Sequence, residues 1–96
     1  MVQINWTDQA VNDLKNIYEF ISADSDYYAR RELSKIKLRT HNIKLFIRVG
    51  RVVPEFNNPN IREVIEGRYR IVYRIISTHA VDILTVHHSS RPNIQI

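Results

Sequence analysis

Cysteine is absent from this chain of 96 residues, which excludes disulfide bonds, thiolate chemistry and zinc sites built on cysteine. No apolar run approaches the roughly 20 residues that span a bilayer. The first residues show neither the basic nor the apolar segment of a secretory signal peptide. We therefore expect a soluble, cytoplasmic protein that makes no use of a membrane.

Glycine is scarce, with two residues, and no glycine-rich phosphate loop is present. A serine–histidine–aspartate arrangement in a usable context is also missing. Among the four histidines, His41 and His79 are isolated, and the adjacent His87 and His88 would point to opposite faces of a strand. We therefore expect neither a metal ion nor a small-molecule cofactor.

Positive charge is in excess, with 14 Lys and Arg against 10 Asp and Glu, which gives a net charge of +4. This excess favours polyanionic partners but does not identify them. The hydrophobic content of 44% and the charged content of 25% are ordinary for a globular chain. The length suits one modest core, so we expect a single domain over residues 1–96.

Apolar spacing predicts a strand and then a helix at the start of the chain. Val2, Ile4 and Trp6 alternate with polar residues, as in a strand with one buried face. Thr7 or Asp8 can cap the helix, which should end near Ser22. Its apolar stripe consists of Ala10, Val11, Leu14, Ile17, Tyr18 and Ile21.

A second, long helix follows a short polar turn, with Asp24 or Ser25 as its cap and Gly50 ending the helical region. Its apolar seam consists of Ala29, Leu33, Ile36, Thr40, Ile43 and Ile47. Its exposed side is basic and carries Arg30, Arg31, Lys35, Lys37, Arg39, Lys44 and Arg48. That side is either a solvated face or a contact surface for nucleic acid or an acidic partner.

After an irregular segment rich in proline and asparagine, the pattern predicts three strands in a meander, at 61–65, 68–76 and 81–88. Gly67 allows the first turn, and Ser77–Ala80 form the second. The order β-α-α-β-β-β indicates an α+β fold. An N-terminal strand and a helical hairpin would pack with a small, mostly antiparallel sheet.

The register of the last hairpin can be predicted from its turn. Symmetric closure places Arg70 opposite His87, Tyr73 opposite Leu84 and Arg74 opposite Ile83. One face would then be apolar, and the other would be a basic shelf of Arg68, Arg70, Arg74 and His87. A slip by one residue would exchange His87 for His88, so both stay candidates. Loops of two or three residues around Gly67 give opposite registers for the preceding hairpin.

Such a shelf could support metal-free cleavage of RNA, which needs a base, an acid and cations around the phosphorus. Glu55 or a histidine could be the base, the other the acid, and Arg70 with Arg91 the charge clamp. Further expected nucleic-acid contacts are Arg51, Arg62, Arg68, Arg74, Lys37, Lys44 and Arg48. The structural alternative is that the strand arginines form weak ion pairs with Glu63 and Glu66.

Three motifs carry a resemblance to a known family: Gly50-Arg51-Val-Val-Pro-Glu55, Tyr69-Arg70-Ile-Val-Tyr73-Arg74 and Val86-His87-His88-Ser-Ser-Arg91. Together with the order of elements, they resemble the RelE/ParE superfamily of type II toxin–antitoxin toxins over nearly the whole chain. The resemblance implies a small toxin domain neutralised by a cognate antitoxin, whose extended segment wraps the toxin.

Members of this superfamily divide by mechanism. RelE- and YoeB-like toxins cleave mRNA on the ribosome without metal, whereas ParE-like toxins poison DNA gyrase. Glu55 and Arg70 match the catalytic glutamate and arginine of the YoeB branch. The histidine of that branch aligns with Ser89 or Ser90, so His87 and His88 come too early.

The end of the chain fits two branches. Arg91 could match the carboxy-terminal arginines of RelE-like toxins, and a His-x-x-Arg ending also occurs among ParE-like chains. We expect a ribosome-dependent mRNA endoribonuclease with the ribosome and mRNA as partners. The alternative is a DNA gyrase inhibitor that binds without catalysis.

Overall fold

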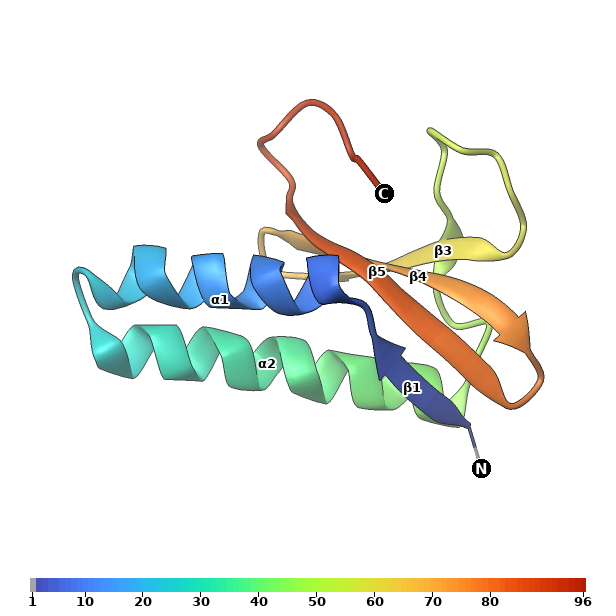
Figure 1. Ribbon diagram of the computed structural model, residues 1–96, viewed down its shortest axis with the longest axis horizontal. Coiled ribbons are helices and arrows are strands. Elements are labelled where there is room, and N and C mark those ends of the chain that lie inside the picture. The colour runs from blue at the N-terminus through green and yellow to red at the C-terminus, as the bar shows by residue number, and fades with distance from the viewer. Residues whose placement is uncertain (1) are drawn as a thin grey trace.

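The computed structural model describes residues 2–96, with two helices on one face of a five-stranded sheet (Figure 1). The elements are β1 (Gln3–Trp6), α1 (Asp8–Ser22), α2 (Asp26–Leu45), β2 (Arg51–Val52), β3 (Ile61–Glu66), β4 (Tyr69–Ser77) and β5 (Ala80–His88). The predicted α+β fold is confirmed. The prediction missed β2, because a strand of two residues is too short to show alternation.

Side-chain caps fix the start of both helices. The Thr7 hydroxyl accepts from the Ala10 N–H at 3.2 Å, and the Ser25 hydroxyl accepts from the Tyr28 N–H at 3.2 Å. The helix α1 ends at Ser22 as predicted, whereas α2 ends at Leu45, before Gly50. The two helices run antiparallel, and their connecting turn lies beyond the end of the sheet (Figure 1).

The first strand lies beside the last. The sheet order is β1-β5-β4-β3-β2, with β1 parallel to β5 and every other neighbouring pair antiparallel. The β1–β5 pairing runs from Gln3 opposite Ala80 to Trp6 opposite Ile83. The sheet is therefore mostly antiparallel, as predicted, with its one parallel pair at an edge.

The register of the last hairpin agrees with the prediction over half its length. Arg70 lies opposite His87, but Tyr73 lies opposite Ile83 and Arg74 opposite Asp82. A register shift after Val72 inserts an extra residue into β5, so the predicted partners of Tyr73 and Arg74 were wrong.

The β3–β4 loop settles the register that the sequence left open. It has two residues, with Glu66 opposite Tyr69 and Ile65 opposite Arg70. Gly67 in this loop has a φ of 57°, a conformation that glycine adopts without strain.

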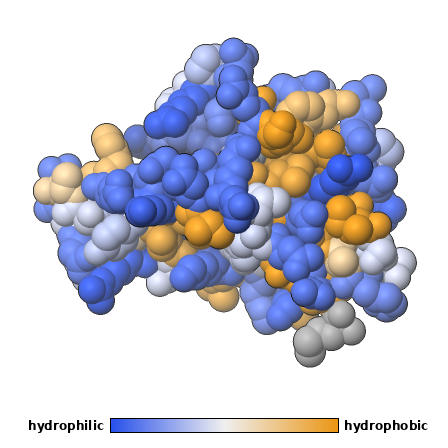
Figure 2. Space-filling view, viewed as in Figure 1, coloured by the Kyte–Doolittle hydropathy of each residue, from blue (hydrophilic) through white to orange (hydrophobic). Residues whose placement is uncertain are grey.

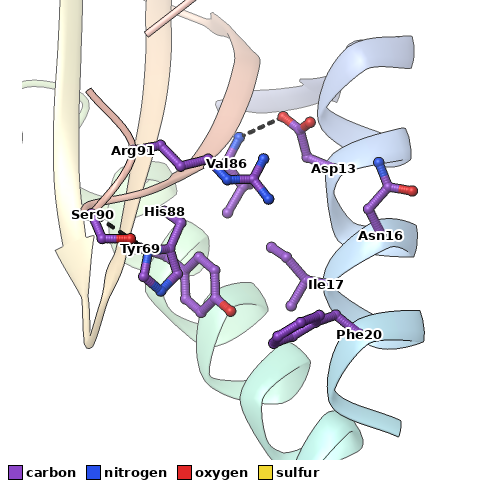
Figure 3. Close-up of a pocket in the computed structure, with 9 residues that line it drawn as sticks. All are labelled: Asp13, Asn16, Ile17, Phe20, Tyr69, Val86, His88, Ser90 and Arg91. Atoms are coloured by element: carbon purple, nitrogen blue, oxygen red, sulfur yellow. Dashed lines mark hydrogen bonds between the residues drawn. The ribbon is translucent and has the colours of Figure 1, made fainter. Parts of the chain in front are cut away.

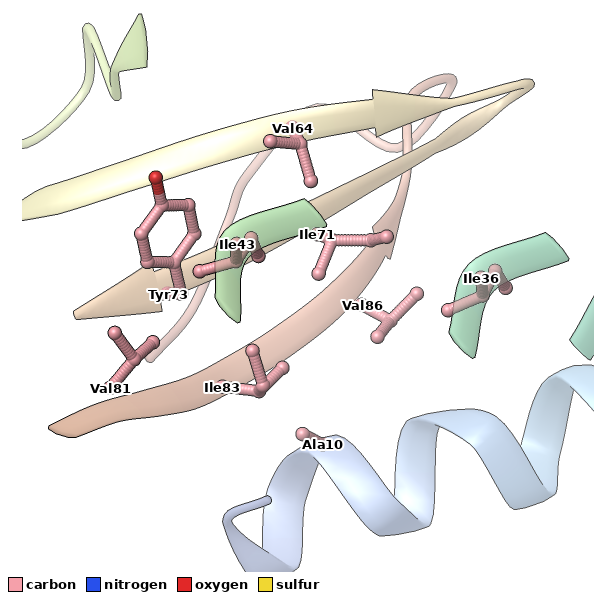
Figure 4. Packing of buried hydrophobic residues seen from close by; sticks show 9 residues of the cluster. All are labelled: Ala10, Ile36, Ile43, Val64, Ile71, Tyr73, Val81, Ile83 and Val86. Carbon is pink, nitrogen blue, oxygen red and sulfur yellow. The ribbon is translucent and has the colours of Figure 1, made fainter. Parts of the chain in front are cut away.

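The main core lies between the helices and the sheet. It consists of Ala10, Ile36, Ile43, Val64, Ile71, Tyr73, Val81, Ile83 and Val86 (Figure 4). The buried Tyr73 hydroxyl donates to the Ile47 carbonyl at 2.9 Å and accepts from the Gly50 N–H at 2.9 Å. Burial raises the pKa of Tyr73. Its ring is fully buried and belongs to the core.

The opposite face of the sheet is not an open basic shelf. Val53, Val72 and Ile94 form a second buried cluster there, flanked by Phe56, Ile61 and Leu84. The C-terminal tail and the loop before β3 lie above the sheet, away from the helices (Figure 1). The predicted shelf is therefore corrected, because these two segments cover part of this face with apolar side chains.

Candidate functional site

Arg70 lies at the centre of the charged groups on the second face of the sheet. It belongs to β4, between Ile65 of β3 and His87 of β5, and its side chain is 14% exposed. Its Nε donates to Oε1 of Glu63 at 2.5 Å. Its two terminal nitrogens donate to both oxygens of Glu55, at 2.8 and 3.0 Å. All three guanidinium nitrogens are therefore engaged by carboxylates.

Glu63 joins Arg70 to a second arginine. Its carboxylate is fully buried and also accepts from Arg51 Nε at 2.6 Å, across the β2–β3 pairing. We call Arg51, Glu55, Glu63 and Arg70 the arginine–glutamate cluster. The sequence suggested weak surface pairing for Glu63. Instead its burial makes the pairing essential, because an unpaired buried carboxylate costs several kcal/mol.

Hydrogen bonding within the cluster shifts the pKa values of Glu55 and Arg70. The bonds from Arg70 lower the pKa of Glu55 to about 2. The same bonds to Glu55 raise the pKa of Arg70. A carboxylate with so low a pKa is a weak proton acceptor near neutral pH.

The two histidines face opposite sides of the sheet, as expected for neighbours on a strand. His87 lies across from Arg70, and its Nε2 is 2.9 Å from the Arg91 carbonyl oxygen. His88 lies on the helix side, where its ring contacts Tyr69 edge-on with centroids 5.3 Å apart. The Ser90 N–H donates to Nδ1 of His88 at 3.2 Å. The structure thus brings Glu55, Arg70 and His87 to one face, and His88 to the other.

A cleft of about 460 Å³ opens between α1 and the end of β5 (Figure 3). It is lined by Asp13, Asn16, Ile17, Phe20, Tyr69, Val86, His88, Ser90 and Arg91. The predicted residues His88 and Arg91 therefore lie together here.

Asp13 joins α1 to β5 beside this cleft. Its carboxylate accepts from the Thr85 hydroxyl at 2.5 Å and from the Val86 N–H at 3.0 Å. Sequence reasoning missed the roles of Asp13, Phe20 and Glu63. The signal for Asp13 was an acid beside the apolar stripe of α1, and the signal for Phe20 was an aromatic residue outside that stripe. The signal for Glu63 was an acid within a predicted strand.

The remaining predicted nucleic-acid contacts are dispersed. Arg62 Nε donates to the Pro59 carbonyl and its NH1 to the Gly50 carbonyl, both at 2.9 Å. Arg68 is exposed in the β3–β4 turn and Arg74 is exposed on β4. Lys37, Lys44 and Arg48 lie on or just after α2, at least partly exposed. Because α2 packs on the other face of the sheet, these three are separate from the arginine–glutamate cluster.

The surface along α1 is largely hydrophilic, whereas hydrophobic side chains gather over the strands (Figure 2). Within residues 2–96, neither helix is long and apolar enough to cross a membrane. Over the same part of the chain, no group of three or more His, Asp or Glu side chains is arranged to hold a metal ion.

These features define a class of small α+β proteins in which a helical hairpin covers one face of a mostly antiparallel sheet. A family described as "ParE toxin of type II toxin-antitoxin system, parDE" matches residues 4–92. The chain belongs to this family.

A solved structure, "Chromosomal ParDE TA system from P. aeruginosa", is similar in fold, with a TM-score of 0.74 at 20% sequence identity. The match covers 92% of this chain and 96% of the other. No curated protein matches the sequence.

Proposed function

We propose that this protein is the toxin of a toxin–antitoxin pair and that it inhibits DNA gyrase by binding, without catalysis. The observation that carries this proposal is the state of Arg70, whose three guanidinium nitrogens are bonded to Glu55 and Glu63. Membership of the ParE family supports the choice of gyrase. The ParDE system of similar fold supports a cognate antitoxin as the partner.

RNA cleavage would require Arg70 and Glu55 to act in ways that the hydrogen bonds between them oppose. A phosphate would need the planar fork of Arg70, which Glu55 already occupies with two bonds. Glu55 would also have to act as a base with a pKa of about 2. Binding without catalysis requires neither step.

The ribosome-dependent endoribonuclease stays a second candidate because of one observation. His87 lies directly opposite Arg70, and Glu55 contacts Arg70, so three predicted catalytic groups adjoin on one face. In that case Glu55 would release Arg70 when RNA binds, and the ribosome and mRNA would be the partners.

One pair of assays separates the two functions. The purified protein is added to supercoiling reactions of DNA gyrase and, in parallel, to translating ribosomes whose mRNA ends are mapped. We expect inhibited supercoiling and intact mRNA. Normal supercoiling at high toxin concentration, with codon-phased cuts, would refute the gyrase proposal.

A histidine variant tests the second candidate directly. Cuts that are lost in the folded His87→Ala variant but kept in His79→Ala, a control in the exposed turn, would establish the endoribonuclease. Under the gyrase proposal neither variant has a cleavage activity to lose.

A further inference from the structure

Exposed apolar side chains and positive charge gather on the same segment of the chain. Of the eleven large hydrophobic residues that are exposed within residues 2–96, six lie in this segment: Tyr27, Tyr28, Leu38, Leu45, Phe46 and Val49. Residues 27–49 also carry seven Lys and Arg against one Glu, a net charge of +6. Because the whole chain has a net charge of +4, the rest of it carries −2. The basic character of the protein therefore resides in α2 and the few residues after it.

An apolar stripe runs along the exposed side of α2. Leu38 and Leu45 are seven residues apart, about two helical turns, and are 69% and 63% exposed. Tyr27, which is 66% exposed, extends the stripe toward the start of the helix, to a length of about 27 Å at 1.5 Å per residue. Helix positions two apart point to nearly opposite sides, so Leu38 points away from the core to which the buried Ile36 and Thr40 belong.

Positive side chains flank this stripe on both sides. Lys37 and Lys44 are seven residues apart and form a row on one side of it. Arg31 and Lys35 are four residues apart and form a row on the other side. None of these four side chains makes an ion pair within residues 2–96. Unpaired like charges repel one another along a helix, so the two rows favour an anionic contact.

The stripe and the two rows have the anatomy of a protein interface, with an apolar centre and a polar rim. A nucleic-acid backbone would pair with the basic rows but would offer no apolar surface to Leu38 and Leu45. A second copy of this chain would bring one segment of charge +6 against another. The surface is therefore complementary to an acidic protein surface with apolar residues at its centre.

We propose that the outer surface of α2, formed by Tyr27, Arg31, Lys35, Lys37, Leu38, Lys44 and Leu45, binds an acidic, apolar-centred surface of the target enzyme, DNA gyrase. Leu38 and Leu45 are covered at the centre of the contact, and the four cations face carboxylates at its rim. This inference rests on the proposed function, because it names the part of the toxin that contacts the target. The arginine–glutamate cluster lies on the other face of the sheet and takes no part in this contact (Figure 1).

Binding of the labelled full-length toxin to purified gyrase, measured without DNA, tests the centre of this surface. Leu38→Ser should weaken binding by about tenfold or more, as expected for an apolar residue at the centre of an interface. Val11→Ser is the matched control, because Val11 is 53% exposed on α1, and it should leave the affinity unchanged. Both variants replace exposed side chains, and thermal unfolding checks that each is folded.

Charge reversal and salt test the basic rim. Lys37→Glu should weaken binding by about fivefold or more at low salt. The difference from the wild type should shrink as the salt concentration rises, because ions screen exposed charges. Lys15→Glu reverses the same charge at an exposed position on α1 and should bind as the wild type does. Equal weakening by the two reversals would show an effect of net charge alone and would overturn the assigned rim.

Other occupants of this surface give different results, each against the proposal. Binding to duplex DNA alone that is lost in Lys37→Glu but kept in Leu38→Ser would assign the surface to nucleic acid. Weakened antitoxin binding by Leu38→Ser, with its gyrase binding kept, would assign the surface to the antitoxin. A dimer of the toxin alone that Leu38→Ser abolishes would assign it to a second copy.

The wild-type protein separates a failure of this surface from a failure of the proposed function. A wild-type toxin that neither binds gyrase nor inhibits supercoiling would refute both. Inhibition by the wild type, and equally by Leu38→Ser and Lys37→Glu, would refute the surface alone and leave gyrase inhibition standing.

Discussion

At the scale of single residues, Glu63 organises the second face of the sheet. Its buried carboxylate bonds to Arg51 and Arg70, and Arg70 in turn holds Glu55 on the loop after β2. The chain of contacts crosses β4, β3 and β2. One buried acid therefore ties an irregular loop to the sheet.

Glu55 makes this arrangement sensitive to acid. Its pKa is lowered to about 2 in the folded protein, chiefly by the bonds from Arg70, against 4.5 for a free side chain. Its contribution to stability is therefore complete above pH 4.5 and is lost as the pH falls toward 2. Because the side chain is 39% exposed, we expect a loss of only about 1 kcal/mol.

Urea unfolding between pH 5 and 2 measures this effect. Glu55→Gln should be less stable than the wild type at pH 5 and should lose less stability on acidification. Glu19→Gln, at an exposed position on α1, is the control and should follow the wild type. Parallel acid curves for Glu55→Gln and the wild type would contradict the pairing with Arg70.

The sequence could predict some of these residue contacts and not others. Arg70 opposite His87 followed from strand alternation and a short turn, which are local properties. The burial of Glu63 depends on Arg51, which belongs to a strand too short to predict. A glutamate within a strand is compatible with either a solvated side chain or a buried ion pair, so its sequence position alone does not distinguish the two.

At the scale of elements, Gly50 fixes how the segment after α2 meets the sheet. A Cβ at this position would lie 2.6 Å from the Glu63 carbonyl oxygen and 2.8 Å from the Tyr73 ring and hydroxyl. Backbone on one side and a fully buried ring on the other leave no room for it. The close approach, rather than a special φ, requires glycine here.

Gly50→Ala should therefore lower the free energy of unfolding by about 1–3 kcal/mol, as overpacking does. Urea denaturation measures the change. Gly67→Asn is the comparison, because asparagine tolerates a positive φ and the nearest atom to its Cβ, on Glu32, is 3.5 Å away. A smaller loss for Gly50→Ala than for Gly67→Asn would contradict the close approach.

Helix α2 shows how a correct pattern can misplace an end. Its seam residues Ala29, Ile36, Thr40 and Ile43 are buried as predicted. Ile47 also packs against the core, although the helix has already ended at Leu45. Apolar spacing predicts which residues face the core. It does not predict the backbone conformation that places them there.

At the scale of the whole molecule, the tail closes the second apolar cluster. Ile94 is 8% exposed and packs with Val53 and Val72, and the Gln9 side chain donates to the Gln95 carbonyl at 2.7 Å. The sequence did not predict this docking, because one isoleucine among polar residues has no periodicity. Ile94 is buried only because the tail folds back onto a sheet face that would otherwise be exposed.

Ile94→Ala should destabilise the protein by about 2–4 kcal/mol, the usual cost of deleting a buried aliphatic side chain. Thermal or urea unfolding measures it. Ile96→Ala, at a position that is 48% exposed, should change stability by no more than about 0.5 kcal/mol. Equal effects of the two substitutions would show that the tail does not dock.

The pairing of β1 with β5 also determines when the sheet can be completed during synthesis. Asn5 donates to Asp82, a residue 77 positions later in the chain, so the sheet edge cannot close until translation has passed this point. At ordinary elongation speeds the first strand waits roughly 4–15 s for its neighbour. The helical hairpin can form during this interval, but the completed surface arises only at the end. The edge of the sheet formed by β1 therefore exists only in a chain whose synthesis is nearly complete.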